Sequence, residues 1–193
     1  NKMDFPYPRC ILLNSTEPIM QIIPIPITFL SVIHTENSFL YSGVFLFFLP
    51  FLIWDKGYFI YYGDFNVQQI PFYKMTHDAI RSGNVLWNWY TDLGANFVGS
   101  YAFYLLGSPY FWLTLLFPSK AVPYLMAPLL MLKFGTAAVT SYAYLRRFVK
   151  NGNYAVIGSL LYAFSGYSIY NIFFNHFHEV IAFFPLLLIG MEE

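Results

Sequence analysis

The sequence predicts an all-α, polytopic membrane protein with about four spanning helices, and three observations lead to that prediction. Only 10% of the residues are charged, whereas a soluble domain has roughly 25%. Aromatic residues make up 22% of the chain, and their rings favour the bilayer interface, where one end is wet and the other apolar. Four strongly apolar stretches approach the roughly 20 residues that a spanning helix needs.

The first 36 residues are predicted to form a separate, proline-rich segment whose role the sequence does not indicate. Prolines are dense there and interrupt helices, and the acidic residues Asp4 and Glu17 argue against a signal peptide. Residues 37–193 are predicted to be a transmembrane domain. Because the chain starts with Asn and stops directly after an apolar run, we expect it to be the N-terminal part of a longer protein.

The first span is predicted at Asn37–Trp54, with a kink at Pro50. After it, residues Asp64–Arg81 place apolar side chains at helical spacing between polar ones. That pattern indicates an amphipathic helix lying on the membrane surface. Pro71 is expected to shorten or bend this helix, and Gly83-Asn84 marks a turn after it.

Three more spans are predicted further along the chain, at residues 121–145, 154–170 and 173–191. The segment 93–119 is also uncharged and long enough to cross, but glycines and prolines interrupt it. Its fate depends on the basic cluster Arg146, Arg147 and Lys150, which should face the cytoplasm. That orientation holds if the segment does not cross fully, so we predict an interfacial or re-entrant helix over residues 101–117.

This arrangement brings two polar loops to the outer face. One begins at Asp64, directly after the first span, and the other is Asn171–Glu179. Asp64 has two interpretations. It is either a solvated carboxylate that helps to end the span, or a general base that takes a proton from an acceptor hydroxyl within hydrogen-bond reach.

Further along the first loop, Asp92 and Asn96 lie in a run crowded with aromatic and amide side chains. Aromatic rings beside polar groups suit sugar binding, although an interfacial aromatic belt explains the tryptophans equally well. In the second loop, His176, His178 and Glu179 either ligate a divalent cation or form a polar border to the fourth span. The border is the interpretation we favour, so no metal site is predicted.

Lys133 lies near the middle of the second span. A charge there costs about 3 kcal/mol on insertion scales, so such residues usually face a cavity or a partner. We expect it to meet a lipid phosphate or a carboxylate, unless its side chain reaches the interface.

Several sets of residues resemble the bacterial YfhO family. They are Gly63-Asp64 with the Gln/Pro/aromatic stretch behind it, Leu93-Gly94-Ala95-Asn96, and the runs 142–147, 161–167 and 184–190. The resemblance implies the GT-C glycosyltransferase architecture, in which a sugar moves from a polyprenyl-phosphate donor to an acceptor outside the cytoplasmic membrane. It further implies envelope polymers such as lipoteichoic acid as acceptors, and an acidic base in the first outer loop, a position that Asp64 matches.

The leading hypothesis is therefore part of an inverting membrane glycosyltransferase in the cell membrane, with its active face outside. Asp64 would be the base, and Lys133 or Arg81 would meet the donor phosphate. The rival hypotheses are a transporter or flippase, with Lys133, His176 and Glu179 as ion-coupling groups, and a non-catalytic membrane scaffold. A cofactor is not predicted beyond the divalent cation considered above.

Other functions are excluded by what the sequence lacks. The net charge is zero, so there is no electrostatic footprint for nucleic acid. The single cysteine, Cys10, rules out an internal disulfide and a cysteine-based metal cluster. No Gly-x-Ser-x-Gly, P-loop, His-Glu-x-x-His or dinucleotide-binding motif is present.

Overall fold

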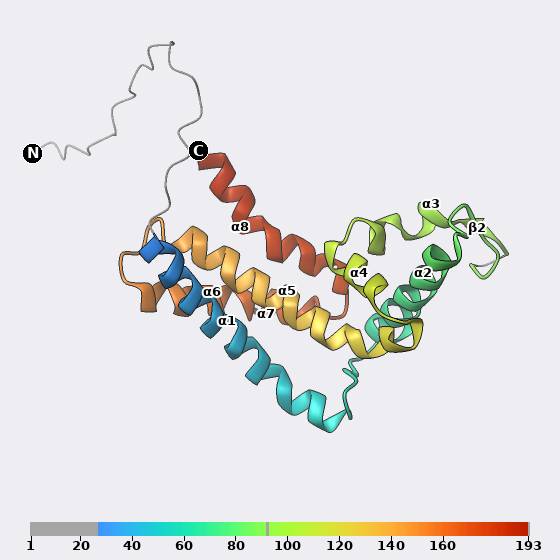
Figure 1. The fold of residues 1–193 in the computed structure, drawn as a ribbon, viewed down its shortest axis with the longest axis horizontal. Coiled ribbons are helices and arrows are strands. Elements are labelled where there is room, and N and C mark those ends of the chain that lie inside the picture. The colour runs from blue at the N-terminus through green and yellow to red at the C-terminus, as the bar shows by residue number, and fades with distance from the viewer. Residues whose placement is uncertain (1–26, 92, 193) are drawn as a thin grey trace, which may run out of the picture.

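A computed structural model describes residues 27–91 and 93–192, with side chains from Glu36 onward. The described chain is mostly helical and has two parts (Figure 1). Four helices form a bundle: α1 (Ile27–Trp54), α5 (Val122–Leu145), α6 (Gly152–Ala163) and α8 (His178–Glu192). The loop between α1 and α5 folds into a lobe of short elements at the right of the figure, which we call the loop lobe (residues 58–121).

Helix α5 is the centre of the bundle, because α1, α6 and α8 all pack against it. Phe48 of α1 meets Phe134 of α5 edge to face, with ring centroids 5.2 Å apart. Gly135 allows a close approach of the same two helices, since a Cβ atom there would lie 2.2 Å from the ring of Tyr41.

Helices α6 and α8 accompany only the second half of α5. Helix α8 runs parallel to α5, because Glu179 at its start pairs with Lys133 and Glu192 at its end pairs with Arg147. The first half of α5 instead packs on the loop lobe, where Tyr73 and Phe65 share a buried cluster with Met126. The bundle and the loop lobe therefore meet at the level of Lys133.

Two helices among the described residues are long and apolar enough to cross a membrane, Glu36–Trp54 and Ser119–Leu145. They coincide with the first two predicted spans. Helix α1 begins at Ile27, earlier than predicted, because no proline follows Pro26 until Pro50. Pro50 lies inside α1 as expected.

The third and fourth predicted spans correspond to shorter pieces. Helix α6 has 12 residues and is followed, after a break, by α7 (Gly166–Tyr170). Ser165 makes the break by accepting a hydrogen bond from the backbone N–H of Ser168, which is the geometry of a helix N-cap. Helix α8 has 15 residues and follows a single 3-10 turn, η5 (Asn175–Phe177). A count of four crossings thus stays a prediction.

The amphipathic segment of the loop lobe is helical, as the sequence predicts. It consists of a π-helical turn, η1 (Phe65–Gln69), and helix α2 (Ile70–Ser82). Pro71 is the second residue of α2 and directly follows the π-helical turn, so the missing N–H falls where the helix changes its hydrogen-bond pattern. Gly83 ends the helix in the left-handed conformation, with φ of 75°.

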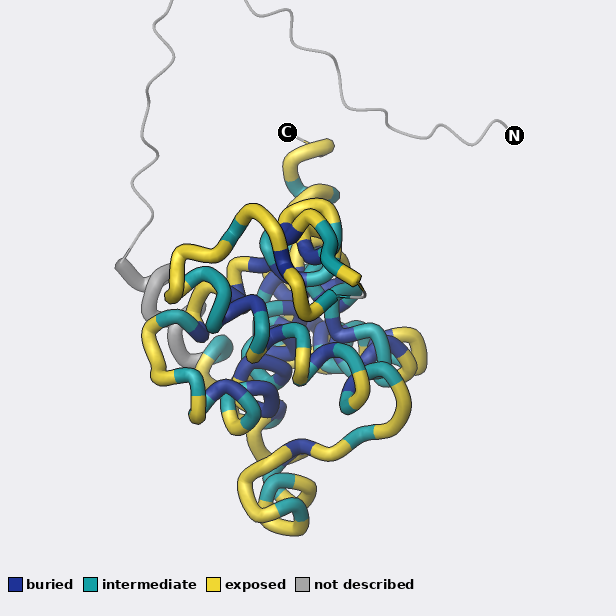
Figure 2. The backbone as a smooth tube through the Cα atoms, turned by 90° about the vertical axis from the view of Figure 1, so that its right-hand side faces the viewer, coloured by how far each residue is buried: buried dark blue, intermediate teal, exposed yellow. Residues whose placement is uncertain are grey.

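The segment 93–119 contains no single long helix. It is divided into α3 (Phe97–Tyr101), η2 (Ala102–Leu106), α4 (Pro109–Leu113), η3 (Thr114–Leu116) and η4 (Ser119–Ala121, which leads into α5). One feature departs from the all-α prediction, a two-stranded antiparallel pair of β1 (Trp87–Asn88) with β2 (Ala95–Asn96). Buried positions gather in the middle of the molecule and exposed ones along its outer turns (Figure 2).

Candidate functional site

The Asp64 loop and the loop before α8 lie against each other. The rings of Tyr62 and Phe173 are 5.1 Å apart, and the side-chain amide of Gln69 lies 3.5 Å from Nδ1 of His176. Gly63 makes this approach possible. It has a left-handed φ of 57°, and a Cβ atom there would lie 2.0 Å from the Phe173 ring.

Asp64 is half-buried at the start of η1 and follows directly on Gly63. Its carboxylate does not cap the helix. Within residues 27–91 and 93–192, no hydrogen bond or ion pair reaches this carboxylate. Its lone pairs are therefore open to a ligand. The rings of Tyr61 and Tyr62, which precede Gly63 in the chain, lie 4.7 Å apart.

Lys133 has the carboxylate partner that its position in α5 requires. It is fully buried, and its Nζ lies 2.8 Å from Oε1 of Glu179. The same ammonium donates to Asn175, at 2.9 Å to the backbone carbonyl and 3.1 Å to Oδ1. Ser108 donates to Glu179 Oε1 at 2.5 Å. This polar hub (Ser108, Lys133, Asn175 and Glu179) joins α5, α8, the second loop and the loop lobe.

Several buried polar atoms around the polar hub have no hydrogen-bond partner in the described part of the chain: Tyr73 OH, Tyr110 OH, His178 Nε2 and Glu179 Oε2. Tyr110 also places its ring 5.6 Å from Lys133 Nζ. Burial raises the pKa of Tyr73, against the attraction of Lys133, so its hydroxyl stays protonated and can donate. Buried polar atoms are normally paired by protein or ordered water, so these four atoms mark the polar hub as an unusual centre in an otherwise apolar core.

The two histidines point into different surroundings. His176 packs between the rings of Phe103 and Tyr104, with centroids 4.9 and 5.0 Å away. His178 is buried against Phe134, 4.7 Å from its ring. The described residues contain no group of three His, Cys, Asp or Glu that could hold a metal ion. A cation would also compete with Lys133 for Glu179, so the residues do not fit a divalent metal.

The other predicted site residues do not converge on Asp64. Arg81 lies at the far end of α2, roughly 25 Å along the helical path at 1.5 Å per residue. It donates to the backbone carbonyls of Leu115 and Phe117, at 3.0 and 3.3 Å. Asn96 caps α3 by accepting from the N–H of Gly99 at 2.7 Å. Asp92 lies outside the described residues.

Sequence reasoning missed four members of this region: Tyr73, Ser108, Tyr110 and Asn175. A signal for Ser108 was available, because serine followed by proline is typical of a helix start, and Ser108 does cap α4. Tyr73 and Tyr110 carried no such signal, since tyrosines abound in this chain. Asn175 was part of the polar run before the fourth span but was not singled out.

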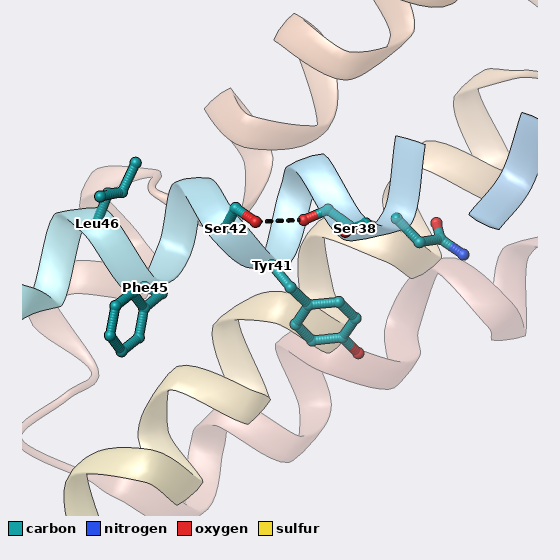
Figure 3. A pocket seen from close by; sticks show the side chains of 6 residues that line it. Ser38, Tyr41, Ser42, Phe45 and Leu46 are labelled. Carbon is teal, nitrogen blue, oxygen red and sulfur yellow. Dashed lines mark hydrogen bonds between the residues drawn. The ribbon is translucent and has the colours of Figure 1, made fainter. Parts of the chain in front are cut away.

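A hollow of about 770 Å³ lies along an exposed face of α1 (Figure 3). Tyr41 and Phe45 point to the same side of the helix there. The Ser42 hydroxyl donates to the Ser38 carbonyl at 2.8 Å, within the helix itself. The described residues that line the hollow carry no charge, which suits a lipid-facing surface rather than a reaction site.

The long apolar helices and the buried ion pair beside them define a helical membrane protein. The chain belongs to the family described as bacterial membrane protein YfhO, which matches it over residues 37–193. The match confirms the family to which the sequence motifs pointed. No curated protein and no solved structure matches the chain.

Proposed function

We propose that the chain is part of a GT-C-type, inverting glycosyltransferase of the cell membrane. It would transfer a sugar from a polyprenyl-phosphate donor to a cell-envelope acceptor such as lipoteichoic acid. The observation that carries the proposal is the Asp64 carboxylate. It is half-buried, follows a membrane-length helix, and has no polar partner among the described residues. A general base needs these properties, provided an acceptor hydroxyl comes within about 3 Å.

The proposed membrane arrangement has four crossings, with the third formed by α6 and α7 and the fourth by α8 with η5. The basic cluster after α5 would face the cytoplasm. The Asp64 loop and the loop before α8, which touch in the structure, would then open to the outside together, where a lipid-linked donor presents its sugar.

Lys133 acts in this proposal as a positioning residue. Its charge is matched by Glu179, and its bonds to Asn175 fix the second loop beside the Asp64 loop. Arg81 ties α2 to the carbonyls of the loop lobe. Its distance from Asp64 means that it cannot contact the reacting sugar together with that residue. His176, which neighbours Gln69, is closer to the proposed reaction site.

The test replaces Asp64 by Asn in the full-length protein in its own membrane. Asn keeps the size and hydrogen bonding of the side chain but cannot take the proton, so we expect sugar transfer to fall about 10²–10⁴-fold with unchanged membrane insertion. Asp55→Asn is the matched control. Asp55 also follows α1, and its carboxylate only accepts from the N–H of Ile60 at 2.9 Å. Transfer at the normal rate in Asp64→Asn would refute the base assignment.

One observation favours the transporter hypothesis, namely the ion pair between the fully buried Lys133 and the largely buried Glu179, because intramembrane ion pairs often mark ion pathways. The two functions separate in proteoliposomes. A transporter would move protons or cations in a way that Glu179→Gln abolishes and Asp64→Asn does not. If neither flux nor sugar transfer is found with the full-length protein, the scaffold hypothesis is favoured.

A further inference from the structure

A groove of about 510 Å³ lies on the loop lobe, between α2 and the β1 end of the hairpin. Its volume falls within the range of small-ligand sites, about 300–1,000 Å³. The residues lining it come from α2, from the turn after it and from the hairpin: Pro71, Lys74, Met75, Asp78, Ala79, Ser82, Asn84, Asn88 and Tyr90. None of them belongs to the polar hub, and none is Asp64 or one of the residues 61–63 before it.

Asn88 is the buried polar group of this groove. It is only 4% exposed, and its side-chain N–H donates at 3.1 Å to the thioether of Met75, which is a weak acceptor. Its Oδ1 accepts from the N–H of Tyr90 at 2.8 Å. The side-chain amide has two N–H donors, and the described residues supply only the sulfur. One N–H of the Asn88 side chain is therefore available to donate a hydrogen bond to a ligand in the groove.

The charges of the groove cancel. Lys74 and Asp78 form an ion pair at 2.8 Å, and Lys74 also donates to Ser119 at 2.9 Å. Partial burial raises the pKa of Asp78, but hydrogen bonds from Lys74, Ser119 and His77 lower it more, so the carboxyl is ionised at neutral pH. One positive and one negative group, already paired, offer no net attraction to a phosphate or an ammonium group. They suit hydroxyl groups, which both donate and accept.

Tyr90 supplies an aromatic wall. Tyr90 is 90% exposed at the rim of the groove. The exposed rings of Trp87 and Trp89 pack on each other in the same hairpin, 5.8 Å apart, and do not line the groove. An aromatic face has a negative quadrupole that attracts weakly positive C–H groups. A sugar or polyol unit offers both kinds of group. Its hydroxyls can bond to the polar floor of the groove, and its C–H groups can pack on the ring of Tyr90.

We propose that this groove binds an uncharged, hydroxyl-rich unit of the polymer acceptor, at a subsite remote from the reacting sugar. This inference deepens the proposed function and rests on it for the existence of a polymer acceptor. Because the groove has no net charge, it favours an acceptor with uncharged repeating units over a poly(glycerol phosphate) chain. Asp78 is roughly 20 Å along the helical path from Asp64, at 1.5 Å per residue. One sugar cannot touch both places, whereas a polymer can. A donor with a single sugar on its lipid has no second unit to place there.

The proposal is tested by calorimetric titration of the purified, detergent-solubilised full-length protein with a linear, uncharged gluco-oligosaccharide. We expect saturable binding that weakens about tenfold in Tyr90→Ala, which corresponds to roughly 1.4 kcal/mol. Ala79→Trp, which fills the groove from the α2 side, should abolish it. Tyr167→Ala is the matched control, because Tyr167 is also an exposed tyrosine, 65% accessible, but lies on α7.

Poly(glycerol phosphate) is the second arm of the titration. It should bind more weakly than the uncharged oligosaccharide, because the groove has no net positive charge. The proposal is overturned if the oligosaccharide does not bind, if Tyr90→Ala and Ala79→Trp bind it normally, or if the polyanion binds more tightly with a strong salt dependence. None of these measurements needs sugar transfer, so the groove and the Asp64 base can fail independently.

Discussion

At the scale of single residues, the ion pair of Lys133 and Glu179 is a contact that tolerates little change. Lys133 is fully buried and Glu179 is 16% exposed at the side chain. Removing one partner of a buried pair leaves an uncompensated charge, which costs more than the pair itself contributes. The pair should therefore matter for the assembly of the two loops as much as for stability.

We predict that Lys133→Met and Glu179→Gln each destabilise the protein by about 3–5 kcal/mol. The double variant should recover most of that loss, because neither charge remains. Denaturant unfolding in detergent, followed by circular dichroism, measures the three values as a double-mutant cycle. Strictly additive losses would show that the two side chains do not interact as the structure indicates.

The sequence could predict that Lys133 needs a partner, because a charge in the middle of an apolar run is costly. It could not predict that the partner is Glu179, since the contact joins two elements that are far apart in the chain. The same limit applies to the contact between the two loops. Gly63 beside Asp64 was visible, but the Phe173 ring that makes a glycine necessary was not.

At the scale of the elements, α1 and α5 are held close by a glycine. Gly135→Ala would push a methyl group against the ring of Tyr41. Overpacking of this kind typically costs about 1–3 kcal/mol, and we expect that loss in the unfolding free energy. Gly43→Ala is the matched control, because Gly43 lies in α1 and an added methyl group there would meet nothing within 4 Å. It should be neutral or stabilising by up to about 1 kcal/mol. Equal effects of the two variants would contradict the close packing.

Long uninterrupted apolar runs gave the most accurate element predictions. The second predicted span, 121–145, corresponds closely to α5, and the first ends with α1 at Trp54. The predicted span 154–170 is divided instead, because Ser165 and Gly166 start a new helix there. The prediction of a single span relied on the apolar composition of these residues and did not take the helix-capping serine into account. The β1–β2 pair, of two residues per strand, is too short to leave a periodic pattern.

At the scale of the whole molecule, the proposed orientation can be tested by cysteine labelling. With Cys10 replaced, a membrane-impermeant thiol reagent added outside should modify a cysteine at position 84 or 170, but not one at 151. All three native residues are exposed: Asn84, Asn151 and Tyr170. Asn175 is unsuitable, since it is buried on Lys133. Modification of a cysteine at position 151 from outside would show that the protein has the opposite orientation in the membrane.

The dependence of the bundle on α5 has a consequence for biosynthesis. Helix α1 leaves the ribosome first, yet its main packing partner is separated from it by residues 55–121. At a synthesis rate of about 5–20 residues per second, α1 waits roughly 3–15 seconds for α5. During that interval the faces of Leu40, Val44 and Phe48, which are buried in the finished protein, are still uncovered. Lipid or an insertion factor must shield them until α5 arrives to cover them.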